Sequence, residues 1–293
     1  MLLKEDTVIG FIGTGVMGKS MAGHLLNARY QLTVHTRTRE KAQELIDKGA
    51  NWSESARQVA EKANVIFTIV GYPSDVEEIY LGEEGIIENG KPGSFVIDMT
   101  TSTPSLAKKI YEQAKAKGLF ALDAPVSGGD IGAREARLAI MVGGDNEAFL
   151  EIEPILNLIG TNVIHQGDAG AGQNTKMCNQ IAIASNMIGV CEAVIYAEKA
   201  GLDPETVLRS ISTGAAGSWS LSNLAPRMVN ENFEPGFYIK HFIKDMKIAL
   251  DEAKRMDMEV PGLSLALSLY EQVAKKGEEN SGTQALYKYW KQS

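Results

Sequence analysis

Cysteine is scarce in this sequence, and basic charge in excess and long apolar runs are absent. The two cysteines, Cys178 and Cys191, form no Cys-x-x-Cys pair and no Cys/His cluster. A disulfide framework, a zinc site and other metal sites are therefore not predicted. Both thiols are expected to be buried in the protein core.

Basic residues do not outnumber acidic ones: 29 Lys and Arg stand against 37 Asp and Glu, for a formal net charge of −8. A chain without a positive field is not expected to bind nucleic acid or an anionic membrane surface. No apolar run reaches the roughly 18 residues of a membrane span, and the acidic Glu5 and Asp6 do not resemble a signal peptide. We therefore expect a cytoplasmic protein.

What the first half of the chain does contain is an alternation of short apolar runs and helical patterns. The expected strands cover residues 7–12, 32–35, 65–70, 95–98, 119–122, 139–142 and 162–164. Nearly continuous apolar strands separated by helices predict an α/β fold, a Rossmann-type doubly wound parallel sheet with helices on both faces. The first domain is expected to span residues 1–166.

After these strands only helical patterns remain. The first of them, residues 168–200, is long and apolar on most sides, with Asp168 as its expected N-cap. We expect it to join the two domains and to build the interface of a homodimer or homotetramer. The next helix is expected to follow Asp203 as N-cap, with Pro204 at its first position. An all-α domain over residues 167–293 is therefore predicted.

A glycine-rich turn between the first strand and the first helix is the clearest motif. Its residues are Gly13, Thr14, Gly15, Val16, Met17 and Gly18. A GxGxxG turn placed between a strand and a helix predicts dinucleotide binding. The first glycine permits the tight turn, the second lets the backbone approach the pyrophosphate, and the third allows the helix to pack on the strand. The start of the helix then presents N–H groups to the anion.

The second expected strand ends without the acidic residue that holds the ribose of NAD. The residues at this point are His35, Thr36, Arg37, Thr38 and Arg39. Guanidinium and hydroxyl groups suit the 2′-phosphate of NADP. NADP is therefore the preferred cofactor, and NAD stays possible if the arginines only form a solvated basic turn.

Another candidate segment follows the fifth expected strand, at the edge of the sheet where such folds bind ligands. Ser127 offers a hydroxyl group, and Gly128 and Gly129 can turn successive N–H groups toward an anion. This combination suits a small carboxylate.

The long helix carries one ammonium group beside two amides. Lys176, Asn179 and Gln180 share a face because they lie three and four residues apart. Such a row on a buried helix indicates a functional role. From composition alone, Lys176 could equally be a charge that reaches the surface.

Taken in order, the motifs resemble those of the β-hydroxyacid dehydrogenase family. This family includes 3-hydroxyisobutyrate dehydrogenase, tartronate semialdehyde reductase and glyoxylate/succinic semialdehyde reductase, and it is related to 6-phosphogluconate dehydrogenase. The matching segments are residues 10–18, 98–101, 123–129, 170–180 and 244–246, so the resemblance covers the whole chain. It implies an NAD(P)-dependent oxidoreductase that interconverts a small carboxylate-bearing aldehyde or keto acid and its hydroxyacid.

The resemblance also implies roles for single residues. Lys176 would be the catalytic acid/base, and Asn179 would position the substrate. The other implied substrate contacts are Ser127, Gly128, Gly129, Gln180 and Trp219. The implied cofactor contacts outside the glycine-rich turn and the 36–38 segment are Val70, Gly71, Tyr72, Thr101 and Lys244. Trp219 either faces the substrate or packs in the core.

The chain departs from the family pattern at two places. The family usually has Leu-Pro or Met-Leu-Pro where this chain has Gly71-Tyr72. The family's catalytic asparagine falls three or four positions after the lysine, so either Asn179 or Gln180 could be the positioning amide.

Two other classes of function stay open. An imine reductase shares this architecture but lacks the lysine at position 176. A non-catalytic NADPH-binding interaction module would not need Ser127, Lys176 and Asn179 together. Among the hydroxyacid enzymes, a preference for NADP favours the reductive direction.

Overall fold

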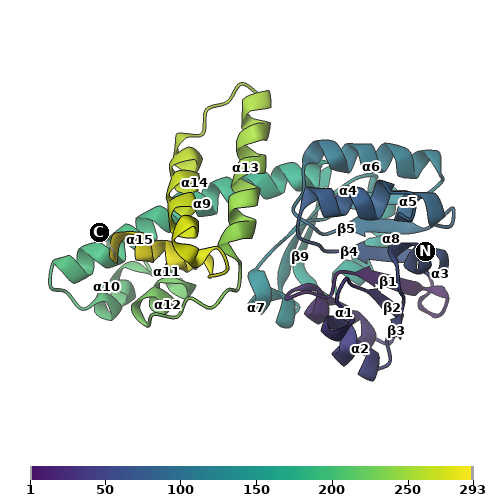
Figure 1. Ribbon diagram of the computed structural model, residues 1–293, viewed down its shortest axis with the longest axis horizontal. Coiled ribbons are helices and arrows are strands. Elements are labelled where there is room, and N and C mark those ends of the chain that lie inside the picture. Colours follow the sequence, from purple (N-terminus) through teal and green to yellow (C-terminus); the bar gives the residue numbers. More distant parts are fainter. Residues whose placement is uncertain (1, 292–293) are drawn as a thin grey trace. The chain divides into compact units, whose positions relative to one another are not determined.

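The computed structural model describes residues 2–291, and they form two compact units. The units divide between Lys176 and Met177, inside one long helix. The sequence-predicted domain boundary between residues 166 and 167 stays a prediction. Figure 1 shows the elements of both units, coloured along the chain.

A mostly parallel sheet of nine strands forms the centre of the first unit. The strands are β1 (Val8–Ile12), β2 (Gln31–His35), β3 (Asn51–Trp52), β4 (Val65–Thr68), β5 (Phe95–Asp98), β6 (Phe120–Asp123), β7 (Val126–Ser127), β8 (Leu138–Gly143) and β9 (Gly160–Gly167). Their order is β3-β2-β1-β4-β5-β6-β8-β7, with β9 beside β8. All seven predicted strands are present, and the two-residue strands β3 and β7 were not predicted.

The sheet is not parallel throughout, as the sequence had suggested. β8 runs antiparallel to both β6 and β7, whereas every other pair is parallel. The chain returns from β7 to β8 through one short helix, Gly129–Arg134. Parallel neighbours need a longer crossover of about a dozen residues or more, so this connection reverses the strand direction.

Helices cover both faces of the sheet. They are α1 (Gly18–Asn27), α2 (Gln43–Asp47), α3 (Ala56–Lys62), α4 (Pro73–Leu81), α5 (Ile86–Asn89), α6 (Pro104–Ala116), α7 (Gly129–Arg134) and α8 (Asn146–Leu156), with short 3-10 turns at Lys4–Asp6 and Arg39–Ala42. Figure 1 shows α4, α5 and α6 on one side of the strands and α1 and α2 on the other. The predicted doubly wound α/β sheet is thus confirmed.

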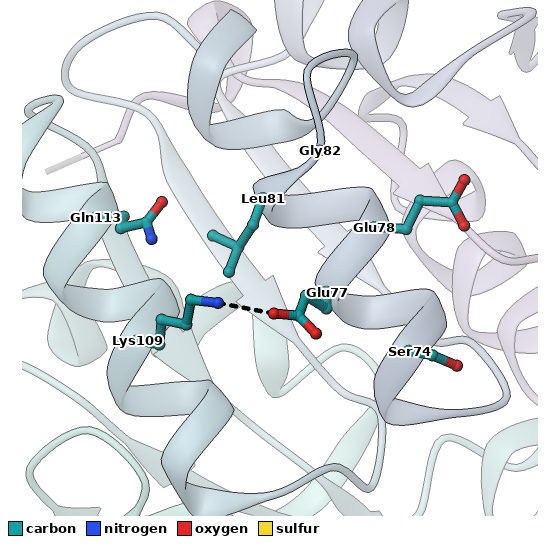
Figure 2. A pocket seen from close by; sticks show the side chains of 7 residues that line it. All are labelled: Ser74, Glu77, Glu78, Leu81, Gly82, Lys109 and Gln113. Carbon is teal, nitrogen blue, oxygen red and sulfur yellow. Dashed lines mark hydrogen bonds and ion pairs between the residues drawn. The ribbon is translucent and has the colours of Figure 1, made fainter.

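Helices α4 and α6 border a shallow surface hollow of about 430 Å³. Figure 2 shows its lining, in which Lys109 Nζ of α6 lies 2.7 Å from Glu77 Oε1 of α4. The remaining lining residues are Ser74, Glu78, Leu81, Gly82 and Gln113. None of the sequence-predicted site residues lines this hollow.

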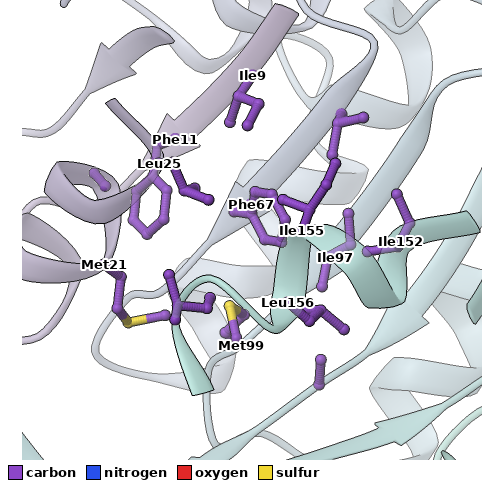
Figure 3. Packing of buried hydrophobic residues seen from close by; sticks show 14 of the residues in the cluster. Ile9, Phe11, Met21, Leu25, Phe67, Ile97, Met99, Ile152, Ile155 and Leu156 are labelled. Atoms are coloured by element: carbon purple, nitrogen blue, oxygen red, sulfur yellow. The ribbon is translucent and has the colours of Figure 1, made fainter. Parts of the chain in front are cut away.

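Strand side chains alternate between two apolar clusters, one on each face of the sheet. Val65 and Phe67 belong to the cluster with α1 and α8, whereas Ile66 between them belongs to the cluster with α3, α4 and α6. Figure 3 shows the first cluster, in which Phe67 lies among side chains of β1, β5 and α8. Burial of one such side chain contributes about 1.5–3 kcal/mol to the stability of the folded protein. The two clusters therefore stabilise the packing of the helices on both faces of the sheet.

The regular elements in the described part of the second unit are all helices. They are α9 (Ala171–Lys199), α10 (Pro204–Ile211), α11 (Trp219–Asn223), α12 (Ala225–Val229), α13 (Ile239–Arg255), α14 (Pro261–Val273), the turns η3 (Ala274–Glu278) and η4 (Thr283–Tyr287), and α15 (Lys288–Lys291). An isolated bridge joins Tyr238 and Gly282. Asp203 caps α10, because its Oδ2 accepts from Thr206 N at 3.1 Å. The predicted helical domain and the cap of α10 are confirmed.

Helix α9 differs from the prediction at its start. It begins at Ala171 and not directly after Asp168, whose backbone oxygen accepts from Ala171 N. The carboxylate that bonds its first N–H groups belongs to another residue, described below. By length and composition alone α9 could cross a membrane, but half of its most apolar window is buried inside the protein, as in a core helix.

The two thiols on α9 have different surroundings. Cys191 is buried among apolar side chains, as expected, whereas Cys178 is exposed. The prediction for Cys178 was wrong because two residues along a helix turn the side chain by about 200°, away from the buried side that holds Lys176.

Candidate active site

The glycine-rich turn has the geometry that a dinucleotide requires. Gly13 has a φ of +98°, and an added Cβ would lie 2.1 Å from Ile69 O. A Cβ at Gly18 would lie 1.9 Å from Gly13 O, so the third glycine allows α1 to pack against the turn. A Cβ at Gly15 would meet no protein atom within 4 Å. The first and third glycines are thus needed by the fold, and the second faces open space.

Two features of this turn suit a bound pyrophosphate. Thr14 Oγ1 is buried and has no hydrogen-bond partner among the described residues, and a phosphate oxygen would supply one. No described side chain caps the start of α1, and an uncapped helix start can bind an anion. Val16 lies half exposed in the turn, and Met17 packs against the core.

The segments predicted to bind the cofactor meet at the carboxyl ends of the strands. Gly13 N donates to His35 O at 2.9 Å, which joins the glycine-rich turn to the end of β2. Val70 N donates to Thr100 Oγ1 at 3.0 Å, which joins the segment after β4 to the segment after β5. Thr101, partly exposed, follows directly. The sequence-predicted cofactor residues of this unit therefore occupy one edge of the sheet.

The two arginines after β2 have different environments. The side chain of Arg37 is 83% exposed, and its Nη1 lies 3.4 Å from Asp75 Oδ1. The guanidinium of Arg39 lies over the ring of Trp52, 5.5 Å from its centroid. Thr36 is partly exposed and Thr38 exposed. Arg37 is therefore the arginine that remains available to a phosphate at the end of β2.

Asp75 was not singled out in the sequence. It lies in the first turn of α4, and its Oδ2 accepts from Tyr72 N at 3.0 Å. This bond fixes the loop that holds Val70 and Gly71, both partly exposed. The Gly71-Tyr72 departure from the family pattern is thus accommodated by a backbone hydrogen bond to a helix-capping carboxylate.

A buried polar network lies beneath this edge. Asp98 Oδ1 accepts from Thr68 Oγ1 and from Thr100 N, both at 3.0 Å. Because Thr68 Oγ1 uses its single proton in this bond, the hydroxyl of Tyr80 is the donor in the 2.9 Å bond between the two hydroxyls. Burial raises the pKa of Asp98 to about 6, an effect to which the charge of the neighbouring Asp123 adds.

This raised pKa predicts how stability depends on pH. An unfolded aspartate loses its proton near pH 4, whereas Asp98 in the folded protein keeps it until about pH 6. The folded state therefore binds more protons between these values, and the free energy of unfolding is expected to fall by about 3 kcal/mol as pH rises through this window. Urea unfolding of the wild type and Asp98→Asn over this range measures the effect. Equal pH dependence in the two proteins would contradict it.

Lys176 lies against the segment predicted to bind a carboxylate. Its side chain is buried, at 6% exposure, and its Nζ donates to Val126 O at 2.9 Å. Ser127 follows directly, paired with Ala139 of β8. Gly128 then has a φ of +129°. The ammonium group and the turn at Gly128 are thus brought together as the sequence had suggested.

Asp123 places the start of α9 at this edge. Its Oδ1 accepts from Gly170 N at 2.7 Å and its Oδ2 from Gln173 N at 2.8 Å. Burial raises the pKa of Asp123, and these backbone hydrogen bonds oppose the rise. A Cβ at Gly172 would lie 2.6 Å from Asp123 O, so only glycine permits this close approach. A carboxylate at the end of β6 therefore takes the role predicted for Asp168.

The remaining candidates belong to the helical unit. Asn179 Nδ2 donates to Gln180 Oε1 at 2.7 Å, and Gln180 Nε2 donates to Asp245 Oδ2 at 2.6 Å. Asp245 Oδ1 lies 3.0 Å from Lys244 Nζ. Gln180 and Asp245 are buried, whereas Asn179 is partly exposed. The structure thus brings three predicted residues together through one aspartate that the sequence reasoning did not single out.

Trp219 lies apart from these residues in the chain, at the start of α11. It is 56% exposed, and its backbone oxygen accepts from Asn223 Nδ2 at 2.9 Å. Packing of Trp219 in the core, one of the two alternatives, is therefore wrong. Contact with the substrate stays a prediction.

Known families match both parts of the chain. The NAD binding domain of 6-phosphogluconate dehydrogenase matches residues 8–167. The family described as NAD-binding of NADP-dependent 3-hydroxyisobutyrate dehydrogenase matches residues 170–290. Together the two matches extend from β1 to α15.

Individual proteins are similar over nearly the whole chain. An uncharacterized oxidoreductase of Bacillus subtilis is 66% identical over 96% of this chain and 98% of its own. The 2-hydroxy-3-oxopropionate reductase of Escherichia coli is 40% identical over 95% of each chain. The solved structure of Psf3 in complex with NADP+ and 2-OPP superposes with a TM-score of 0.89 at 26% identity, covering 98% of this chain and 100% of that one.

Proposed function

Since the chain belongs to the family of NAD(P)-dependent β-hydroxyacid dehydrogenases and reductases, we propose that it uses NADPH to reduce a small carboxylate-bearing aldehyde or keto acid. The product is the corresponding hydroxyacid, and the reaction is reversible. The enzymes of this family that carry a named activity act on small hydroxyacids, such as 3-hydroxyisobutyrate and 2-hydroxy-3-oxopropionate.

One observation carries this proposal: the buried ammonium of Lys176 is bonded to Val126 O at 2.9 Å, one residue before Ser127. A proton donor therefore lies beside a hydroxyl and a turn of two glycines with positive φ angles. In this arrangement the turn binds a substrate carboxylate, and the adjacent carbonyl group comes within reach of Lys176.

Each residue of the first unit then has a defined task. The reduced nicotinamide, when bound, supplies the hydride for the carbonyl carbon. Ser127 Oγ and the N–H groups of Gly128 and Gly129 bind and orient the carboxylate. Lys176 Nζ donates a proton to the oxygen as negative charge develops on it, and in the oxidative direction it accepts that proton.

We assign the substrate contact to Asn179 rather than Gln180. Both ends of the Gln180 amide are engaged, since Nε2 donates to the acceptor-only carboxylate of Asp245 and Oε1 accepts from Asn179. The Gln180 amide is thereby held in one orientation, and Asn179 must present its Nδ2 to it. Asn179 is therefore the amide that we propose to contact the substrate, and Gln180 acts by positioning Asn179.

Selectivity for NADPH is proposed to depend on Arg37. The Arg37→Ala variant is expected to lower kcat/KM for NADPH by about 10- to 100-fold, because a hydrogen bond to a charged group contributes about 1.5–3 kcal/mol. The value for NADH should change little, since NADH has no 2′-phosphate.

Arg39→Ala is the matched control, because Arg39 lies over Trp52 and should leave the ratio of NADPH to NADH unchanged. Steady-state kinetics with both cofactors make the comparison. An equal loss with NADH and NADPH in Arg37→Ala would contradict the assignment.

Oxidation of NADPH in the presence of four aldehydes tests the proposed function: glyoxylate, succinic semialdehyde, tartronate semialdehyde and methylmalonate semialdehyde. Turnover with at least one is the expected result. Tight NADPH binding without turnover of any carbonyl acid would favour a non-catalytic NADPH-binding module. Turnover of cyclic imines alone would favour an imine reductase.

Several features stay predictions. Contacts of Val70, Gly71, Tyr72, Thr101 and Lys244 with the cofactor follow from the family resemblance. The contact of Trp219 with the substrate is a prediction from the same resemblance. The cytoplasmic location is predicted from the lack of a signal-peptide pattern in the sequence, and the homodimer or homotetramer from the apolar long helix.

A further inference from the structure

A fully buried glutamine of α9 links this helix to the segment after β5. Gln173 has 0% exposure. Its Nε2 donates to Thr100 O at 2.7 Å, and its Oε1 accepts from Ser102 N at 2.9 Å. The side chain thus pairs with the backbone on both sides of Thr101, as a neighbouring strand would.

The backbone of Gln173 is held as firmly as its side chain. Its N–H donates to Asp123 Oδ2 at 2.8 Å, which ties it to the end of β6. Gln173 precedes Lys176 by three residues, about one turn of the helix, and Lys176 Nζ is itself fixed on Val126 O. A displacement of Gln173 would therefore displace Lys176 as well.

The segment on the other side of the glutamine is also constrained. Thr100 N donates to the buried Asp98, and Thr100 Oγ1 accepts from Val70 N. These bonds fix the position of Thr100 relative to the sheet, but they do not fix the residues that follow it. The Gln173 amide supplies the bond beyond Thr101, at Ser102 N.

We propose that Gln173 is a positioning residue, which fixes the Thr101 segment against the first turn of α9 and so sets the distance between the bound nicotinamide and the ammonium of Lys176. The inference rests on the proposed function, in which the Thr101 segment contacts the cofactor and Lys176 supplies the proton. Hydride and proton must reach the two atoms of one carbonyl group, so their sources need a fixed separation.

The test is the Gln173→Met variant, which keeps an unbranched side chain of similar length and removes both hydrogen bonds. A positioning role predicts a loss of about 10- to 100-fold in kcat, with little change in the Kd for NADPH. The kinetic isotope effect on kcat with NADPH deuterated at the transferred position should increase, because hydride transfer becomes slower than the other steps.

Gln284→Met is the matched control. Gln284 is another buried glutamine, with 1% exposure, whose Nε2 donates to Asn232 O and Glu234 O in the helical unit. Both variants should lose thermal stability, and only Gln173→Met should lose kcat. Equal kcat and equal isotope effects in the two variants would overturn the inference, as would a raised Kd for NADPH with unchanged kcat.

A second variant keeps the test decisive if Gln173→Met does not fold. In Gln173→Glu, a carboxylate still accepts from Ser102 N but can donate to Thr100 O only when protonated. Its kcat relative to the wild type should therefore rise as pH falls, and a ratio that is independent of pH would overturn the inference. Absence of turnover by the wild type would overturn the proposed function itself. Turnover by the wild type with unaffected Gln173 variants would overturn this inference alone.

Discussion

Replacement of Lys176 by methionine is expected to lower kcat by about 10²- to 10⁴-fold, the usual contribution of a positioned proton donor, while NADPH binds with unchanged affinity. Methionine fills a similar volume next to Val126 but carries no proton. Because the ammonium is buried and bonded to Val126 O, bulk water does not replace it as the proton donor. Steady-state kinetics and NADPH titration separate the two effects.

Two further variants sharpen this result. In Lys176→Arg the positive charge is kept, but a guanidinium does not release its proton at accessible pH, so kcat should fall nearly as far as in Lys176→Met. Lys199→Met changes an exposed lysine in the last turn of the same helix and should leave kcat unchanged. Activity of Lys176→Arg close to that of the wild type would mean that position 176 supplies charge and not a proton.

Removal of the Asp123 carboxylate is expected to destabilise the protein by about 3 kcal/mol, because Asp123→Ala leaves two buried N–H groups at the start of α9 without partners. The effect should be smaller than the sum of two charged hydrogen bonds, since burial already disfavours the charged carboxylate and raises its pKa. Activity should fall as well, because Gln173 and Lys176 lie in the turns that this carboxylate holds.

A helix-capping aspartate in the other unit provides the comparison. Asp203 caps α10 at an exposed position, where loss of a cap costs about 1 kcal/mol. Urea unfolding of Asp123→Ala and Asp203→Ala measures the difference. Equal destabilisation by the two changes would show that the start of α9 does not depend on Asp123.

The sheet and its cofactor-binding edge were predictable because their signals are local. An apolar run followed by GxGxxG and a helical pattern fixes β1, the turn and α1 within one stretch of sequence. The carboxyl ends of neighbouring parallel strands then bring Gly13, Val70 and Thr101 to one edge without further information. The same reasoning brought Ser127 to that edge. Lys176 was placed there only by the family resemblance, because it lies on a helix and not at the end of a strand.

The residues that sequence reasoning missed act over long separations. Asp123 lies 47 residues before Gly170, and Gln180 lies 65 residues before Asp245. No periodicity links such pairs, so the sequence suggested the nearby Asp168 as the cap of α9 and left Asn179 and Gln180 unresolved. One signal was present: Asp98 and Asp123 each end a buried strand, and a carboxylate in that position needs hydrogen-bond donors from other parts of the chain.

The antiparallel pairing of β7 and β8 was not predicted, for a related reason. β7 has only two residues, too few to show the alternation that distinguishes a strand. The direction of β8 relative to β7 depends on the short connection through α7. In the sequence, this connection looks like the helical crossovers between the parallel strands.

The most direct test of the central claim is the fate of the transferred hydrogen. NADPH deuterated at the transferred position is incubated with the wild type and the aldehyde that it turns over, and the product is examined by mass spectrometry and NMR. The proposed mechanism predicts a hydroxyacid with one deuterium on the carbon that was the carbonyl carbon, and far less of this product with Lys176→Met. A product without deuterium at that carbon, or equal amounts of labelled product from both proteins, would contradict this mechanism.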